Sequence, residues 1–314
     1  MLNFSWHWSP GTLIFLIILC LLYGFGIWRV HRRNLPDTPL KIYNILAFVT
    51  AILGIALVLL TPIDTIARTQ LFAAHMVQAV ALTTICAPFL LFACPRWLLL
   101  PLVQHPVLQP IARFLTKPVI ASGIFNITFL LWHAPGPYHF ALQHGTVYHI
   151  ELLSILLTSL LNWWPLIGPV KELRKMSYPM QMLYAFVDGQ PVDIFAFLLV
   201  FTGVVFYPYY TIPAQLAQFG VSPIADQTIG GAFLLLPGLV DLVVMSPLFF
   251  RWLGQIEEKA TIADQQRQEE MEAEAALLEM EETETSDPTT HTPKTMPPSN
   301  VVHTPCAESP SHPT

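Results

Sequence analysis

Long apolar runs, separated by short polar segments, dominate residues 10–252 of the chain. Each run approaches or exceeds the roughly 18 apolar residues that a helix needs to cross a membrane. The pattern predicts seven spanning helices, over residues 10–30, 42–61, 70–93, 118–134, 147–167, 180–206 and 229–252. The alternating segments of about ten residues that mark a membrane β-barrel are absent from the sequence. We therefore expect an all-α, polytopic membrane bundle of about seven transmembrane helices.

Composition and charge agree with this interpretation and orient the bundle. Hydrophobic residues make up 54% of the chain and charged residues 11%, which is about half the charged share of a soluble protein. Lys and Arg cluster in the segments 31–41, 94–117 and 168–179, whereas the intervening segments between spans hold only Arg68. Because positive charge collects on the cytoplasmic side, we expect the N-terminus outside and the C-terminus in the cytoplasm.

The character of the chain changes after residue 254. Residues 1–254, the predicted seven-helix transmembrane domain, carry 12 Lys and Arg against 8 Asp and Glu, whereas residues 255–314 carry 3 against 13. Residues 255–284 are rich in Glu, Gln and Ala, which predicts an acidic cytoplasmic helical extension. Residues 285–314 are rich in Pro, Thr and Ser, which predicts disorder. No basic cluster in the sequence indicates nucleic-acid binding.

Histidines gather at the predicted outer face. His75 and Met76 begin the third span, with Gln78 in the next turn. Two prolines are expected to stop the fourth span just after His133, at the same depth as His75. Glu151 lies at the start of the fifth span. Six of the eight histidines before residue 255 fall on this side, namely His7, His75, His133, His139, His144 and His149.

Two interpretations of this group remain open. Histidines on different helices at matched depth suit a metal or haem site, and imidazole beside a thioether suits copper, especially Cu(I). Alternatively, Met76 fills a gap in the packing and His75 forms a hydrogen bond with a neighbouring helix. The spacing is compatible with both interpretations.

Three carboxylates, Asp188, Asp193 and Asp241, fall inside predicted spans. Ionisable groups inside a membrane are costly, so they are candidates for function. Proton handling is one interpretation, and hydrogen bonding to Asn126 or other polar groups, which would fix the helix packing, is the other. Asp226 and Thr228 precede the seventh span, and one of them is expected to cap that helix.

Seven short motifs together carry a resemblance to a known family. They are AHMVQ (74–78), APFLLFACP (87–95), LWHAPGPYH (131–139), His149-x-Glu151, NWWPLIGP (162–169), YPYY (207–210) and ADQTIGG (225–231). In this order, over roughly residues 70–250, the chain resembles the CtaG-like cytochrome c oxidase assembly factors of the polytopic kind. One position departs from the family pattern, because Ala79 stands where members often have the second histidine of H-M-x-x-H.

The resemblance implies a non-enzymatic membrane assembly factor for a haem-copper oxidase, in the cell membrane of a prokaryote. It implies that copper is handled at the outer face and that oxidase subunits or copper chaperones are the partners. A metal-free scaffold for oxidase subunits and a haem-binding redox protein are the alternatives. The candidate copper ligands are His75, Met76, His133, His139 and His149, with Gln78, Glu151 and Asp226 as supporting polar residues.

Overall fold

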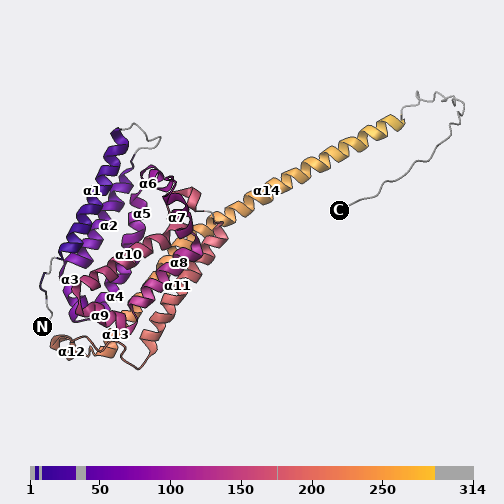
Figure 1. Ribbon diagram of the computed structural model, residues 1–314. Coiled ribbons are helices and arrows are strands. Elements are labelled where there is room, and N and C mark those ends of the chain that lie inside the picture. The colour runs from indigo at the N-terminus through magenta and orange to yellow at the C-terminus, as the bar shows by residue number, and fades with distance from the viewer. Residues whose placement is uncertain (1–3, 7–8, 33–39, 175, 287–314) are drawn as a thin grey trace, which may run out of the picture. The chain divides into compact units, whose positions relative to one another are not determined.

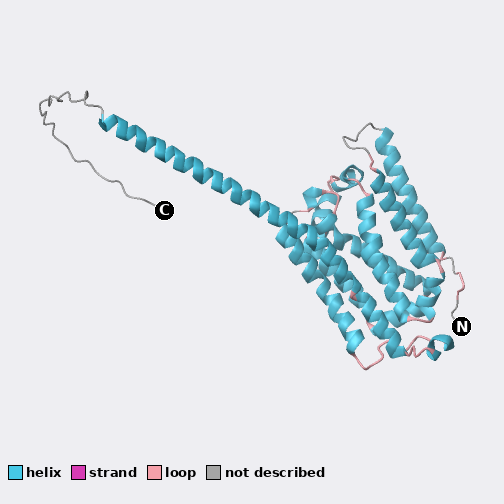
Figure 2. Ribbon diagram, turned by 180° about the vertical axis from the view of Figure 1, so that it is seen from behind, coloured by secondary structure: helices cyan, strands magenta, loops and turns pink. Residues whose placement is uncertain are grey.

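The computed structural model describes residues 4–6, 9–32, 40–174 and 176–286, and every regular element within them is a helix (Figures 1 and 2). The first part comprises α1 (Pro10–Arg32), α2 (Ile42–Leu60), α3 (Pro62–Thr69), α4 (Phe72–Val80), the π-helix η1 (Ala81–Cys86), α5 (Ala87–Ala93), α6 (Arg96–Val103) and α7 (Leu108–Leu115). The second part comprises α8 (Pro118–Trp132), α9 (Pro135–Gln143), α10 (Gly145–Ile167), the short 3-10 helix η2 (Lys171–Leu173), α11 (Tyr178–Phe201), α12 (Ala214–Gln218), α13 (Pro223–Leu234) and α14 (Leu236–Ser286).

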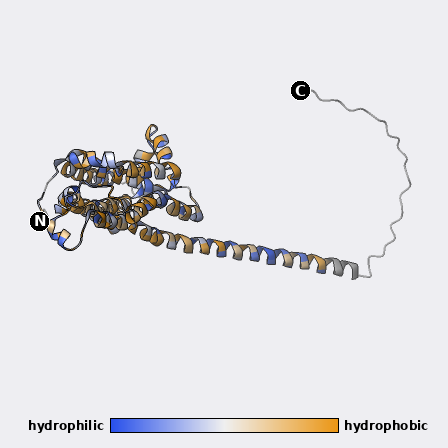
Figure 3. Cartoon of the chain, turned by 90° about the horizontal axis from the view of Figure 1, so that it is seen from below, coloured by the Kyte–Doolittle hydropathy of each residue, from blue (hydrophilic) through white to orange (hydrophobic). Residues whose placement is uncertain are grey.

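The all-α membrane class predicted from the sequence is confirmed. Six helical stretches of the described residues are long and apolar enough to cross a membrane, or up to seven if the bent pair of α7 and α8 forms one span. Figure 3 shows that apolar residues predominate on the helices of residues 10–252. Which end of the bundle faces outward stays a prediction that rests on the distribution of Lys and Arg.

Several boundaries differ from those predicted. The segment after the fourth span is the helix α9, because Pro135 occupies a first-turn position, where a missing N–H costs nothing. The sixth span ends at Phe201 rather than near residue 206, since Thr202 has extended backbone angles. The seventh span is interrupted at Leu235, and Pro237 follows within the first turn of α14.

The span Phe72–Ala93, formed by α4, η1 and α5, lies at the centre of the bundle. Its most apolar stretch is 61% buried, a larger share than in the other five long apolar helices. One hydrophobic core joins η1 and α5 to α1, α2 and α10. A second core joins α4 to α8, α11 and α13. Side chains on α4 are therefore enclosed by helices from both halves of the chain.

Two neighbouring glycines let α13 approach the helices on either side of it. A Cβ at Gly230 would stand 2.6 Å from the ring of Phe72 on α4, and one at Gly231 would stand 2.9 Å from Cβ of Leu199 on α11. Both distances are too short for real atoms, so the contact requires residues without a side chain. The GG pair thus sets the distance between α13 and the helix that carries His75.

The chain divides into two compact units, residues 1–254 and 255–314. In the second unit, residues 255–286 form the last part of α14. The predicted disordered tail, residues 285–314, lies almost entirely outside the described residues.

Candidate metal site

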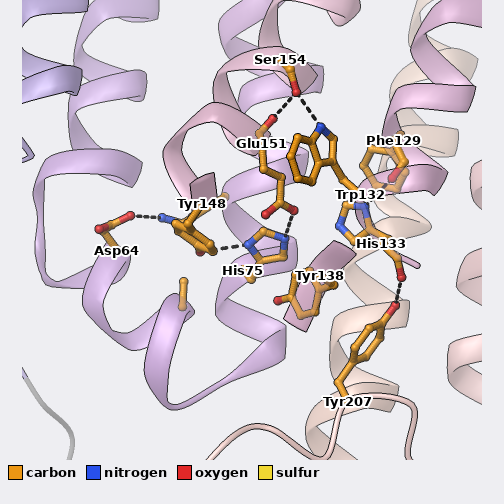
Figure 4. Close-up of polar contacts among 12 residues, drawn as sticks. Asp64, His75, Phe129, Trp132, His133, Tyr138, Tyr148, Glu151, Ser154 and Tyr207 are labelled. Carbon is orange, nitrogen blue, oxygen red and sulfur yellow. Dashed lines mark hydrogen bonds and ion pairs between the residues drawn. The ribbon is translucent and has the colours of Figure 1, made fainter. Parts of the chain in front are cut away.

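Two histidines and one glutamate from three helices converge at one end of the bundle. His75 lies in the first turn of α4, His133 directly follows α8, and Glu151 lies in the second turn of α10. One potential ligand atom from each side chain lies within 4.8 Å of the other two. The residues are 0%, 1% and 0% exposed, so protein encloses the group. Figure 4 shows the glutamate carboxylate and both imidazole rings turned toward one another.

The hydrogen bonds around His75 fix which ring nitrogen carries the proton. Gln78 Nε2 donates to the carbonyl of Val58 at 2.5 Å, which turns Gln78 Oε1 toward Tyr148. The Tyr148 hydroxyl donates to that oxygen at 2.5 Å. Its own oxygen then accepts from Nδ1–H of His75, at 2.9 Å. Because Nδ1 carries the proton, Nε2 of neutral His75 presents a lone pair to the site.

His133 reaches the same state through a main-chain partner. Its Nδ1 lies 2.7 Å from the carbonyl oxygen of Phe129. A carbonyl only accepts, so Nδ1 must donate, and Nε2 again presents a lone pair. The Phe129 ring stacks on the imidazole with centroids 4.2 Å apart, which fixes the ring plane. A hydrogen bond on the second nitrogen is the usual way in which proteins orient a histidine that ligates a metal.

In the part of the chain that the structure describes, no group donates a hydrogen bond to the Glu151 carboxylate. Both of its oxygens are buried and without a hydrogen-bond partner among the described residues, and the same holds for Nε2 of His75 and of His133. Glu151 Oε1 lies 3.2 Å from Nε2 of His75, at ion-pair distance. A lone pair and a carboxylate repel each other at this distance unless a positive charge lies between them. The arrangement therefore calls for a proton or a metal cation.

Buried tyrosines enclose the site from the side of α9. The ring of Tyr138 lies 5.0 Å from that of His75 and 5.9 Å from that of His133. Its hydroxyl is hydrogen-bonded to that of Tyr210, and the Tyr207 hydroxyl donates to the His133 carbonyl at 2.5 Å. Burial raises the pKa of Tyr138 well above its usual range, so the group stays a neutral phenol. Tyr138 thus adds no negative charge to the site.

These observations fit a bound metal ion. Imidazole nitrogen and carboxylate oxygen are common ligands of copper and zinc. Three buried acceptor groups with no donor among them would otherwise cost free energy. The residues present can therefore hold a cation directly, with Tyr148 and the Phe129 carbonyl as the groups that orient the ligands.

The other histidines of the predicted site lie apart from this group. His139 Nε2 is hydrogen-bonded to Gln143, and the ring stacks on Tyr209. His149 Nε2 lies 3.4 Å from Asp64, and its Nδ1 bonds to the Gly145 carbonyl.

Met76 and Asp226 both have roles in packing the helices. Met76 is fully buried and packs in the second core, beside Gly230. Asp226 does not cap its own helix as predicted, because Ser222 accepts from the N–H of Ala225 there. Its two oxygens instead accept from the N–H groups of Phe72 and Ala73, at 2.7 and 3.1 Å. Asp226 therefore caps α4, the helix that carries His75.

The three intramembrane aspartates line a separate cavity of about 70 Å³. Asp188 accepts hydrogen bonds from Asn162 at 2.5 Å and from Asn126 at 3.2 Å. The carboxylates of Asp193 and Asp241 both approach Gly189, within 4 Å of the position that its Cβ would take. His75, His133 and Glu151 do not line this cavity.

Two members of the site were not predicted in their actual roles. Glu151 was expected to support the site, whereas it supplies one of the three converging side chains. Tyr148 is not part of the predicted site, although it stands three residues before Glu151 and thus on the same face of α10. That spacing is the signal in the sequence that could have identified it.

Replacing Tyr148 with Phe should weaken metal binding about 10- to 100-fold with little change in fold. The substitution removes the hydroxyl that holds His75 in the Nδ1–H state, and loss of such a partner typically has this effect on metal affinity. Competitive titration with a metal chelator measures it. Tyr184→Phe is the matched control, because its hydroxyl bonds to Asn162 at the aspartate cavity. Equal losses in the two variants would contradict a specific role for Tyr148.

Comparison with known proteins gives one match. The family model described as cytochrome c oxidase caa3 assembly factor matches residues 21–255, a segment that contains all three converging side chains. No significant match was found among curated proteins or among solved structures.

Proposed function

This chain belongs to the cytochrome c oxidase caa3 assembly factor family, and we propose that it assists oxidase assembly by holding copper between His75, His133 and Glu151. The observation that carries the proposal is the convergence of two buried imidazole nitrogens and a buried carboxylate, none of which has a hydrogen-bond partner among the described residues. Copper is the cargo of this site, and no catalytic turnover is required of the protein.

The charge of the site favours a monovalent ion. Two neutral imidazoles and one carboxylate sum to a single negative charge. Cu(I) would make the buried site neutral, whereas a divalent ion would leave one uncompensated positive charge in a low-dielectric interior. Because the ligands are nitrogen and oxygen rather than thiolate, binding is expected to be weak enough for release to a partner.

The position of the site suits delivery at the outer face. All three side chains lie at one end of the bundle, near the starts of α4 and α10 and just after the end of α8. The distribution of Lys and Arg predicts that this end faces outward. We expect the protein in the cell membrane of a prokaryote, with oxidase subunits or copper chaperones as partners.

The geometry does not favour a bis-histidine haem. A porphyrin needs an open plane between its two axial ligands. The rings of His75 and His133 are 5.4 Å apart by centroid and are tilted by 46°. The ring of Tyr138 packs against both histidines, so these contacts leave no slot for a macrocycle.

Anaerobic titration with Cu(I) against a chelator of known affinity tests the proposal. One ion should bind per wild-type chain. His75→Ala and His133→Ala should each weaken binding at least ~100-fold, because losing a ligand costs more affinity than losing a group that only orients a ligand. His139→Ala and His144→Ala are matched controls, because both side chains lie outside the converging group. A parallel Zn(II) titration should show weaker binding.

The metal-free scaffold is the competing function, and Ala79 in place of a second histidine motivates it. It predicts no Cu(I) binding above that of the His75→Ala variant. It also predicts that cells with His75→Ala assemble an oxidase of normal copper content. That pair of results would remove copper from the proposed function and leave the family membership intact.

A further inference from the structure

A recess with basic walls lies at the other end of α8 and α10 from the metal site. Its volume is about 570 Å³, and its walls include Arg113, Lys117 and Arg174. Lys117 immediately precedes α8, whereas His133 immediately follows it. Fifteen helical residues separate them, or about 22 Å at 1.5 Å per residue. The recess lies where α7 and α8 meet at a bend of 74°.

The basic side chains of the recess have no ion-pair partner among the described residues. Within the described residues, none of its three basic side chains forms an ion pair. Among the described residues of the wall, Glu172 is the only acidic one, and its carboxylate pairs with Arg96 instead. A hydrogen bond from its own backbone N–H and the Arg96 guanidinium lower the pKa of Glu172. Glu172 is therefore ionised at neutral pH and already matched by another cation.

The donors in the recess are suited to an anion with several oxygen atoms. Arg174 Nη1 donates to the Leu166 carbonyl at 2.8 Å, which holds the guanidinium while leaving its other N–H groups available. Lys117 is the N-cap of α8, and no side chain there accepts from the first turn. The positive end of the α8 dipole therefore adds to the charge of the basic side chains.

Exposed apolar side chains, here called the rim, stand within two residues of Arg113 and Pro118 in the sequence, both of which line the recess. Ile111 and Phe114 on α7 are 50% and 52% exposed, and Val119 in the first turn of α8 is 82% exposed. The recess thus lies where an apolar spanning helix begins, at the depth of lipid headgroups. A ligand at this position meets cations on one side and hydrocarbon on the other.

We propose that this recess binds the phosphate of an anionic phospholipid, with the acyl chains against the apolar rim. The shared chemistry is a phosphate group held by guanidinium and ammonium donors. The rim favours a lipid over free phosphate. The proposal does not depend on copper binding at the other end of the bundle.

Native mass spectrometry of the full-length protein, with phosphatidylglycerol or phosphatidylcholine added, tests this proposal. Wild type should retain phosphatidylglycerol in preference to phosphatidylcholine. The double variant Arg113→Gln with Lys117→Gln should bind phosphatidylglycerol about tenfold more weakly or worse. Both side chains are exposed, so the fold should survive, and the melting temperature without added lipid checks this.

A charge-matched control separates a specific site from general attraction. Arg29→Gln with Arg251→Gln removes the same charge from exposed positions that do not line the recess. An equal loss in this control, or no preference of wild type for the anionic lipid, would overturn the proposal. A third arm with inorganic phosphate distinguishes a lipid headgroup from free phosphate. If free phosphate raised the melting temperature of wild type as much as phosphatidylglycerol does at equal concentration, the lipid assignment would be overturned.

Discussion

Glu151→Gln is expected to weaken Cu(I) binding at least ~100-fold while stabilising the metal-free protein, because ligand loss and relief of a buried charge act in opposite directions. Gln has nearly the same shape as Glu but removes the negative charge that attracts a cation. Its amide can also donate to Nε2 of His75, which lies 3.2 Å from the present carboxylate oxygen. The donor-free group of three acceptors would then gain a hydrogen bond.

The expected gain in stability is about 1–3 kcal/mol in the free energy of unfolding, the usual cost of a buried polar group without a partner. Thermal unfolding of the metal-free protein measures it, and chelator competition measures the loss of affinity. Glu257→Gln is the matched control, since this side chain is exposed and far along the chain from the site. It should change neither quantity.

A fall in copper affinity together with a rise in stability distinguishes a ligand from a packing residue. Replacing a residue that serves packing lowers the stability of the protein. A residue kept as a metal ligand, in contrast, commonly makes the metal-free protein less stable. If Glu151→Gln destabilised the protein and left copper affinity unchanged, the carboxylate would be a structural group and the proposed ligand set would be wrong. Added Cu(I) should stabilise wild type more than the variant, because only tight binding shifts unfolding by mass action.

The helices of this protein could be predicted because membrane burial imposes a simple pattern on the sequence. Apolar length located the spans, and Pro118 marks the start of α8. Pro135 was expected only to end the fourth span, although it also begins α9. The π-helix Ala81–Cys86 could not be predicted in this way. Its residues are as apolar as those of the α-helical turns beside it, and the change lies in the hydrogen-bond register rather than in composition.

The location of the candidate site was predictable in part. Matched depth on different spans placed His75 and His133 at one level, and the structure brings them together with Glu151. Depth does not specify the direction of a side chain around its helix axis, however. His149 shares this level but points to Asp64 instead. Which residues converge depends on the rotation of each helix, and tertiary packing fixes that rotation.

The capping of α4 by the distant Asp226 could not be predicted from the sequence. Asp226 and Phe72 are separated by 154 residues, yet the carboxylate accepts the first free N–H group of α4. Local sequence suggested the ordinary role of a cap on the following helix. Nothing in the spacing of the chain indicates that Ser222 takes this role and leaves Asp226 for another helix.

Asp226→Ala should therefore destabilise the fold by about 3–5 kcal/mol, because two N–H groups at the start of α4 would lose their charged acceptor. Asp226 is only 3% exposed, so water has poor access to replace it. Copper affinity should fall with stability, since His75 lies in the turn that these bonds hold. Asp226→Asn retains one side-chain acceptor and should lose about half as much stability. Chemical denaturation and chelator competition measure the two effects.

Ser222→Ala provides the comparison that isolates the cap of α4. It removes the cap of α13 itself, at the base of the same helix, and should cost only about 1 kcal/mol with no change in copper affinity. Asp226 would then act on the site through α4 rather than through general loosening of α13. If Asp226→Ala lowered stability as expected but left Cu(I) affinity at the wild-type value, the first turn of α4 would not control the position of His75. The metal site would in that case be held by α8 and α10 alone.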